Sequence, residues 1–217
     1  MTRIDNFTCY TVKVKTSLFP TLEFEQNLWT GGFLRIAGID EAGRGAWAGP
    51  VAAAAVILPY NLLLTQTLCQ VRDSKLMTPL AREIWTPRIK ESALAWGVGF
   101  ASAREIDSIG IVPATKLAAT RALENLSADY LISDFLVFRE IDLPQTALVK
   151  GDQRSLSVAA ASVLAKTTRD ALMQKLDGRY PGYGFSQHKG YGTPLHQDAV
   201  KRLGLSASHR MSFSITR

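Results

Sequence analysis

The chain has 217 residues, which fits one domain of ordinary size, or one domain with a small appendage. Hydrophobic residues make up 47% of it and charged residues 20%, a balance that excludes an intrinsically disordered protein. The net charge of +6 permits nucleic-acid binding but does not establish it, because many basic proteins bind no polyanion.

The first half of the chain alternates apolar runs with turn residues, after an extension over residues 1–17 that matches no pattern. Thr78 is the expected N-cap of a helix that has Pro79 in its first turn. The full pattern predicts a short helix over residues 21–29, strands over 34–40 and 51–58, a helix from 79 to about 95 and a strand over 96–101. A glycine-rich segment joins the first two strands and predicts a hairpin.

The second half alternates strands with helices. Its pattern predicts helices over residues 103–109 and 113–125, strands over 130–133 and 146–149, a long helix over 156–176 and a further helix near 195–203. Three early strands followed by this alternation are typical of a mixed α/β sheet with helices on its faces.

Three acids follow predicted strands. Asp40, Asp134 and Asp152 each fall at or just after a strand end, where ligands collect in open α/β sheets, and Glu41 is a fourth candidate. Alternation along a strand would separate Asp40 from Glu41, so both reach one site only if the chain is already turning there. Carboxylate oxygens suit Mg²⁺ or Mn²⁺, and two such ions about 4 Å apart could activate water for phosphodiester cleavage. The alternative is that these acids are turn formers or helix caps.

The segment Gly43-Arg44-Gly45 follows the first acids directly. Its glycines remove side chains, so that a polyanionic backbone could approach main-chain N–H groups. The glycine spacing does not match a dinucleotide fingerprint, and no Gly-Lys-Ser/Thr follows that would make a phosphate-binding loop. A plain tight turn is the alternative interpretation.

Four further side chains are candidates for substrate contact. Lys75 could contact a phosphate, although a loop lysine is usually only solvated. Lys166 and Arg169 lie three apart on the long helix and could bind substrate or form an ordinary surface ion pair with Asp170. Tyr191 stands between two glycines and could stack on a base or sugar, or be a bare turn residue.

The C-terminal region carries most of the excess charge. Residues 185–217 hold five Lys or Arg and one acid, which makes a basic patch the expected footprint of a polyanion. Cys9 and Cys69 are far apart, so a disulfide framework is not expected and a reducing compartment fits better. No apolar run reaches the length of a membrane span, and no signal peptide is evident, so we expect a cytoplasmic monomer.

Taken together, these segments resemble bacterial ribonuclease HII, the type 2 ribonuclease H family. The matching segments are GIDEAGRG, AGPVAAAAVIL, DSKLMTP, LISD, KGDQRSLSVAAASVLAKTTRD, HKGYGTPLH and HRMSF, which occur in the family's order and cover roughly residues 20–213. The resemblance implies a ribonuclease H-like catalytic domain over 18–184, with a mixed five-stranded sheet flanked by helices. It implies a small, basic, helical substrate-binding part over 185–217.

The resemblance also implies an activity. The family cleaves the RNA strand of RNA–DNA hybrids and cuts on the 5′ side of single ribonucleotides in duplex DNA, leaving a 3′-hydroxyl and a 5′-phosphate. By motif position, the metal ligands and catalytic acids would be Asp40, Glu41, Asp134 and Asp152. The substrate-binding residues would be Gly43, Arg44 and Gly45 at the 2′-hydroxyl, Tyr191 at the RNA–DNA junction and Lys75 near the scissile phosphate.

Two positions depart from the family pattern. Ala46-Trp47 stands where a proline and a small aliphatic residue are usual, and Phe135 stands where glycine is common. Trp47 affects the expected substrate preference, and Phe135 affects the expected backbone freedom beside Asp134. Two other functions are considered: a non-catalytic hybrid-binding module of the same fold, and a junction resolvase of the same superfamily.

Overall fold

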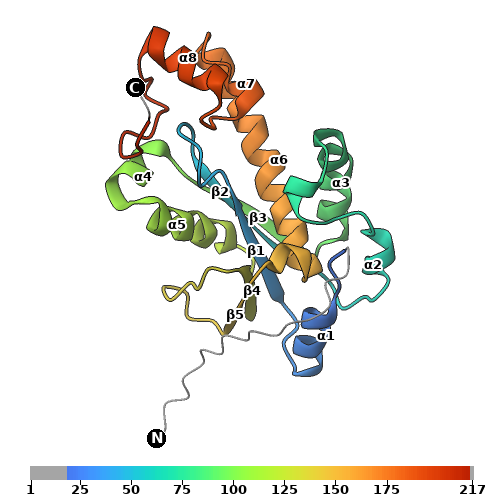
Figure 1. Ribbon diagram of the computed structural model, residues 1–217. Coiled ribbons are helices and arrows are strands. Elements are labelled where there is room, and N and C mark those ends of the chain that lie inside the picture. The colour runs from blue at the N-terminus through green and yellow to red at the C-terminus, as the bar shows by residue number, and fades with distance from the viewer. Residues whose placement is uncertain (1–18, 216–217) are drawn as a thin grey trace, which may run out of the picture.

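A five-stranded mixed sheet forms the centre of the computed structural model, which describes residues 19–215 (Figure 1). The strand order is β3-β2-β1-β4-β5. The strands are β1 (Ile36–Ala42), β2 (Val51–Ile57), β3 (Ala95–Ala101), β4 (Tyr130–Asp134) and β5 (Gln145–Leu148). β2 is antiparallel to both β1 and β3, whereas β4 runs parallel to β1 and β5 parallel to β4. The predicted mixed sheet and its first hairpin are confirmed.

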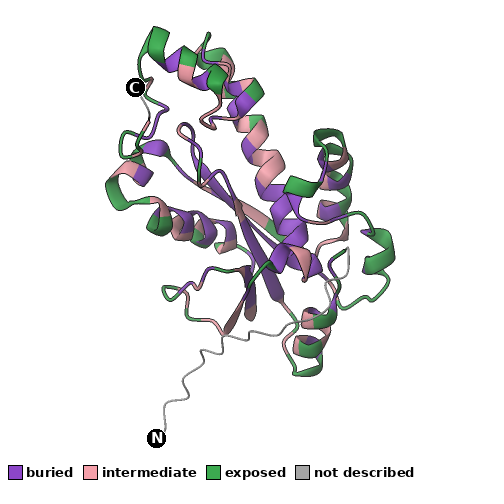
Figure 2. Ribbon diagram, in the orientation of Figure 1, coloured by how far each residue is buried: buried purple, intermediate pink, exposed green. Residues whose placement is uncertain are grey.

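Helices cover both faces of this sheet (Figure 1). One face packs against α1 (Glu23–Thr30), α3 (Pro79–Ser92) and α6 (Leu156–Arg179), and the other against α4 (Ala103–Ile109) and α5 (Ile111–Leu123). Figure 2 shows the buried residues concentrated in the strands and on the inner sides of these helices. The central strand β2, VAAAAVI, is buried at every residue, as expected for a strand covered on both faces.

The C-terminal region extends the fold beyond the sheet. In Figure 1, α7 (Phe185–His188) and α8 (Pro194–Leu203) lie at the end of α6 farthest from α1. A separate small core of Ala48, Met173, Tyr183, Phe185 and Ala199 joins these helices to α6 and to the β1–β2 connection.

Most predicted element boundaries agree with the structure, and the differences have local causes. Thr78 caps α3 by accepting a hydrogen bond of 3.1 Å from the N–H of Ala81, as predicted, but the helix ends at Ser92 rather than near 95. Two four-residue helices, α2 (Leu64–Thr67) and α7, were not predicted, because one helical turn is too short to show a periodic apolar pattern. The unassigned extension over 1–17 lies outside the described residues.

A buried carboxylate joins α1 to the start of α6. Glu25 is 1% exposed, and its Oε1 accepts hydrogen bonds from the hydroxyls of Ser155 (2.6 Å) and Ser157 (2.7 Å) and from the N–H of Ser157 (3.0 Å). Burial raises the pKa of Glu25, against the effect of these hydrogen bonds. The N-terminus of α6 is thereby fixed directly after the turn that carries Asp152.

Over the same described range, no helix has both the length and the apolar character that crossing a membrane requires.

Candidate active site

Acidic side chains from separate segments meet at the edge of the sheet where β1 and β4 end. Asp134 is the last residue of β4, and Asp40 lies near the end of the neighbouring parallel strand β1. Asp152 lies in a 3-10 turn (Gly151–Gln153) before α6, where the N–H of Gly151 donates a hydrogen bond of 2.8 Å to Asp134 Oδ1. The strand-end argument therefore located three of the predicted acids correctly in the fold.

The backbone at Asp40 and Glu41 differs from what the sequence suggested. The chain does not turn at Glu41, because β1 continues to Ala42 and pairs Glu41 with Ala53 of β2. Asp40 is directed to the α6 side, where it accepts a hydrogen bond from Ser162, while Glu41 forms an ion pair of 3.1 Å with Arg44. The charge of Asp134 raises the pKa of both Asp40 and Glu41, so alternation has not separated them electrostatically.

The pKa values of three acids in the cluster are raised. Burial, then the charges of Glu41 and Asp134, raise the pKa of Asp40 well above its usual value, despite its hydrogen bond with Ser162. Burial also raises the pKa of Glu41 and of Asp134, although Arg44 and Lys75 act in the opposite direction. Carboxylates held in this way are stabilised by a cation, and the described side chains compensate them only in part.

Asp152 is buried in the same cluster, with 4% of its surface exposed. Burial and the charges of Asp73 and Asp134 raise the pKa of Asp152 to about 7. Asp73 is a fifth acid of the cluster and was not among the predicted site residues. It is 6% exposed, caps the 3-10 turn Ser74–Leu76 through the N–H of Lys75 (2.9 Å) and hydrogen-bonds to Asp152. Its position directly before Ser-Lys was the only signal in the sequence.

Lys75 faces this cluster from the same turn. Partial burial lowers the pKa of Lys75, but the charges of Asp73, Asp40, Asp152 and Asp134 raise it by more, so that its net shift is upward. The ammonium group of Lys75 is therefore attracted by all four of these acids, although the residue is exposed.

The donor set fits a hard divalent cation. Every charged donor in the cluster is a carboxylate oxygen, which Mg²⁺ and Mn²⁺ prefer, and no sulfur or imidazole ligand competes among them. Within residues 19–215, no three acid, histidine or cysteine side chains stand close enough to form a complete metal site by themselves. The cluster thus has the chemistry for cation binding, and the cation would have to draw its ligands together.

The Gly43–Gly45 turn is shaped by contacts beneath it. Gly43 has a φ of +90°, and a Cβ at this position would lie 1.9 Å from Arg169 Nε. Arg210 donates to the carbonyl oxygens of Gly43 and Arg44, each at 2.7 Å. A Cβ on Gly45 would meet nothing within 4 Å. The first glycine is required for packing, whereas the second leaves open space.

Arg169 is not the surface residue that the sequence suggested. Its side chain is 0% exposed, and its guanidinium donates to the carbonyl oxygens of Pro50 (2.9 Å), Lys189 (3.0 Å) and Ala48 (3.2 Å). The prediction that Arg169 contacts substrate directly is therefore wrong, because it lies beneath the loop and holds its backbone. The ion pair with Asp170 belongs to Lys166 (2.8 Å).

Tyr191 lies above these basic side chains. The centre of its ring is 5.5 Å from the Arg169 guanidinium and 5.7 Å from Lys166 Nζ. The flanking glycines were expected to leave the tyrosine sterically open, but both are tightly packed. A Cβ on Gly190 would lie 2.3 Å from the Ala48 carbonyl oxygen, and one on Gly192 would lie 2.4 Å from the ring of Trp47. Trp47, one of the two unusual residues, thus forms the surface on which the tyrosine loop rests.

The other unusual residue, Phe135, adopts the left-handed conformation that favours glycine. Its φ is +61° and its side chain is 69% exposed, directly after Asp134. Left-handed backbone costs about 1–2 kcal/mol for a residue with a Cβ. Substitution by glycine removes this cost, but part of the gain in stability is lost because glycine has greater freedom in the unfolded chain.

We therefore expect Phe135→Gly to raise the free energy of unfolding by about 0.5 kcal/mol, measured by urea denaturation. Ser127→Gly is the matched control, since Ser127 has a φ of +48° and is exposed in the loop before β4, away from the acids. Both variants should gain stability. A clear loss in Phe135→Gly alone would mean that the phenyl ring contributes to the fold.

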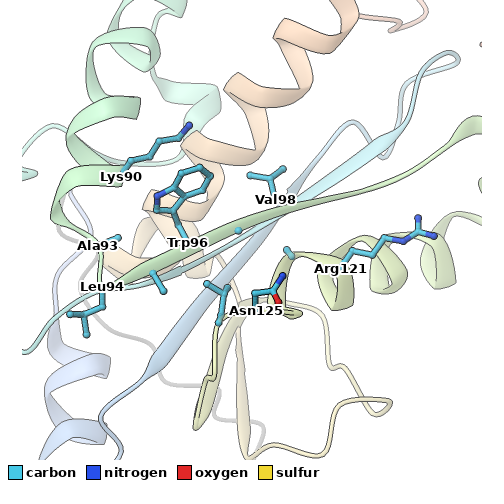
Figure 3. Close-up of a pocket in the computed structure, with 11 residues that line it drawn as sticks. Lys90, Ala93, Leu94, Trp96, Val98, Arg121 and Asn125 are labelled. Atoms are coloured by element: carbon cyan, nitrogen blue, oxygen red, sulfur yellow. The ribbon is translucent and has the colours of Figure 1, made fainter.

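One cavity elsewhere has none of this chemistry. Figure 3 shows it at the edge strand β3, lined by Lys90 of α3, Trp96 of β3 and Arg121 of α5. Its volume is about 510 Å³. No acid lines it, and Lys90 Nζ lies 4.2 Å from the centre of the Trp96 ring. The acidic cluster is therefore the candidate catalytic site.

Comparisons with known proteins point to a single family. The family model described as Ribonuclease HII matches residues 37–216. A ribonuclease HII of Synechococcus sp. (strain JA-3-3Ab) is 52% identical over 199 residues, which cover 91% of this chain and 90% of that protein. The structure of the PCNA:RNase HII complex from Archaeoglobus fulgidus superposes with a TM-score of 0.73 at 25% identity, over 85% of this chain and 97% of that one. Bst-RNase HIII in complex with Mn²⁺ shares the fold, with a TM-score of 0.69 at 20% identity over 84% and 68% of the two chains.

Proposed function

This chain belongs to the ribonuclease HII family, and we propose that it cuts on the 5′ side of single ribonucleotides in duplex DNA as well as within RNA–DNA hybrids. Membership makes it a ribonuclease H, an endonuclease that hydrolyses the RNA of RNA–DNA hybrids with the help of a divalent metal ion. The observation that carries the finer proposal is the acidic cluster beside the open turn at Gly45.

The proposed metal ligands are Asp40, Glu41, Asp134 and Asp152. Bound Mg²⁺ or Mn²⁺, proposed here as a pair, would lower the pKa of the attacking water and stabilise the departing oxygen. The raised pKa values of these acids support the assignment, because burial, together with the charges of neighbouring acids, disfavours their ionised forms unless a cation compensates them.

The other side chains of the site would bind and orient the substrate. Lys75 carries a positive charge over the acids and would hold the scissile phosphate. A bound cation would keep Asp152 ionised, because it offsets the burial and the charges of Asp73 and Asp134 that raise the pKa of this acid without metal. The cleaved strand would then leave with a 3′-hydroxyl and a 5′-phosphate.

Recognition of the ribonucleotide would rest on the Gly43–Gly45 turn and on Tyr191. The 2′-hydroxyl is the group that distinguishes RNA from DNA, and the main chain of an open glycine turn can reach it. Arg210 holds two carbonyl oxygens of this turn on its inner side. Tyr191 would pack against the nucleotide at the RNA–DNA junction, and Lys166 would add positive charge for a phosphate.

A gel assay tests the proposal on three labelled duplexes: one embedded ribonucleotide, a continuous RNA–DNA hybrid and pure DNA. We expect cleavage of the first two, a single cut 5′ of the embedded ribonucleotide, and no cleavage of pure DNA. A chelator should abolish all cleavage, and either Mg²⁺ or Mn²⁺ should restore it. Cleavage of a branched DNA in preference to the ribonucleotide substrates would instead support a junction resolvase, and binding without metal-dependent cleavage would support a non-catalytic module.

The remaining predictions concern the organisation of the protein. A monomer, a cytoplasmic location and the boundary between a catalytic part over 18–184 and a basic part over 185–217 follow from the sequence arguments above. Salt titration of binding checks the electrostatic component, since phosphate contacts make affinity fall steeply with salt.

A further inference from the structure

All three histidines of the chain lie in one buried network beneath Tyr191, and none belongs to the acidic cluster. His188, His196 and His209 are 8%, 0% and 1% exposed. The rings of His188 and His196 stack with their centres 4.3 Å apart, and the Nε2 atoms of His196 and His209 are 3.0 Å apart. Such a cluster of titratable groups is unusual in a core, because burial disfavours the charged form of each.

Backbone donors assign the proton on every ring. The N–H of Ser206 donates to His209 Nδ1 at 2.9 Å, so His209 must carry its proton on Nε2 and donate it to His196 Nε2. His196 then carries its proton on Nδ1 and donates it to the carbonyl oxygen of Tyr191, at 3.0 Å. The same logic applies to His188, whose Nδ1 accepts from the N–H of Gly190 (3.1 Å) and whose Nε2 donates to Tyr183 O (2.8 Å).

The network therefore holds the main chain on both sides of the tyrosine. His196 binds the carbonyl group of Tyr191, and the N–H of Tyr191 donates to the carbonyl oxygen of His188 at 3.0 Å. Trp47 closes the arrangement, with its ring centre 5.6 Å from that of His196. The phenol ring is left at the surface, half-buried over Arg169.

Each ring is satisfied only with one proton. A second proton on His196 would set its Nε2 against the N–H of His209, and a second proton on His209 would oppose the N–H of Ser206. The neighbouring cations add to this, because Lys189 and Arg210 follow two of the histidines in the chain and Arg169 binds the carbonyl oxygen of Lys189. Asp177, which interacts with His188, acts in the opposite direction. Tyr183 and Tyr191 are the neighbouring phenols.

We propose that His196, oriented by His209 and stacked on His188, is a positioning residue that holds Tyr191 at the angle needed to pack against the junction nucleotide, and that it does so only in the neutral form. The inference rests on the proposed role of Tyr191. It goes further in assigning a function to buried side chains that never touch the nucleic acid.

The test compares His196→Asn with His196→Leu. Asparagine can keep a donor for the Tyr191 carbonyl group, whereas leucine cannot. On a duplex with one embedded ribonucleotide, we expect His196→Leu to raise KM about tenfold, the effect of one lost hydrogen bond, with kcat within about twofold of the unsubstituted chain. His196→Asn should recover most of the KM. Val200→Ala, a buried apolar truncation on the same helix, should leave KM unchanged.

A double-mutant cycle separates positioning from a general structural effect. If His196 acts through Tyr191, His196→Leu should have no further effect on KM in a Tyr191→Ala background. Full additivity of the two changes, or an unchanged KM in His196→Leu, would overturn the inference. If Tyr191→Ala alone left KM unchanged while the enzyme still cut embedded ribonucleotides, the proposed role of the tyrosine would fail and the inference with it. Should His196→Leu not fold, the same comparison can be made at His209, the histidine that donates to His196, with His209→Gln against His209→Leu.

Thermal melting provides an independent readout of the neutral state. Burial lowers the pKa of His196 to about 4, from its usual 6.5. Between these values the unfolded chain binds a proton that the folded chain does not, so stability should fall as pH decreases from 6.5 towards 4. His196→Asn should flatten this part of the profile. An unchanged slope would contradict the requirement for a neutral ring.

Discussion

Replacing Asp40 with asparagine should abolish cleavage and at the same time make the metal-free protein more stable. Asparagine has the shape of Asp40 but lacks the charge that would bind a divalent cation, so we expect turnover to fall by at least about a thousandfold. Binding of an RNA–DNA duplex should persist, since the residues proposed to contact the nucleic acid are unchanged. Single-turnover cleavage and a gel-shift assay measure the two effects separately.

The gain in stability follows from the electrostatics of the site. Burial and the charges of Glu41 and Asp134 raise the pKa of Asp40, so the folded state is penalised wherever this carboxylate is ionised. The gain in Asp40→Asn should be full at alkaline pH and disappear as pH falls to 3.8, the ordinary value, below which the carboxyl is neutral in both states. Melting in the presence of a chelator at pH 5 and pH 8 measures it.

Metal should stabilise the unsubstituted protein and have little effect on the variant, because a ligand that binds only the folded state raises its melting temperature. Asp129→Asn is the control: Asp129 accepts hydrogen bonds from the N–H groups of Leu34 and Arg35, at the opposite end of the sheet. It should keep full activity. Normal turnover by Asp40→Asn in Mg²⁺ would remove Asp40 from the catalytic machinery.

Gly43→Ala should reduce the stability of the protein, whereas Gly45→Ala, only two residues away, should reduce its activity and leave its stability almost unchanged. A methyl group at Gly43 would overlap Arg169 Nε at 1.9 Å on a backbone whose φ is +90°, and we expect a loss of about 3 kcal/mol in the free energy of unfolding. A methyl group at Gly45 would meet nothing within 4 Å, so stability should change by less than about 0.5 kcal/mol.

Activity should distinguish the two glycines as well. Gly45→Ala places a methyl group where the ribose is proposed to approach, and it should reduce cleavage of an embedded ribonucleotide about tenfold or more in a fully folded protein. Urea denaturation and initial rates on the same preparations test both variants. A stable Gly43→Ala protein would show that the Arg169 side chain moves freely, and an unimpaired Gly45→Ala enzyme would place the ribose elsewhere.

The sequence predicted the sheet well because its strands are bounded by clear local signals. The apolar runs before Asp40 and Asp134 and the proline-capped start of α3 are short-range patterns, and their positions in the structure agree within a few residues. The convergence of the acids followed from topology alone, since parallel strands end at the same edge.

The sequence could not show which side chains are buried by contacts from distant segments. Arg169 and Arg210 are both basic, as a surface residue would be, and only the fold shows that their guanidinium groups bind carbonyl oxygens of the Gly43–Pro50 segment. Asp73 joins the acids because its turn packs against α6, where Ser162 contacts Ser74. The left-handed conformation of Phe135 has no signal in its own residue type, which normally avoids it.

The Glu25 anchor has a consequence for synthesis on the ribosome. The helix that carries Glu25 is among the first elements to emerge, yet its hydrogen-bond partners lie 130 and 132 residues later in the chain. Until they are translated, the first helix has a carboxylate with no serine to bind. The hydrogen bonds that join the helix of Glu25 to the start of α6 can therefore form only after at least 130 further residues have been translated.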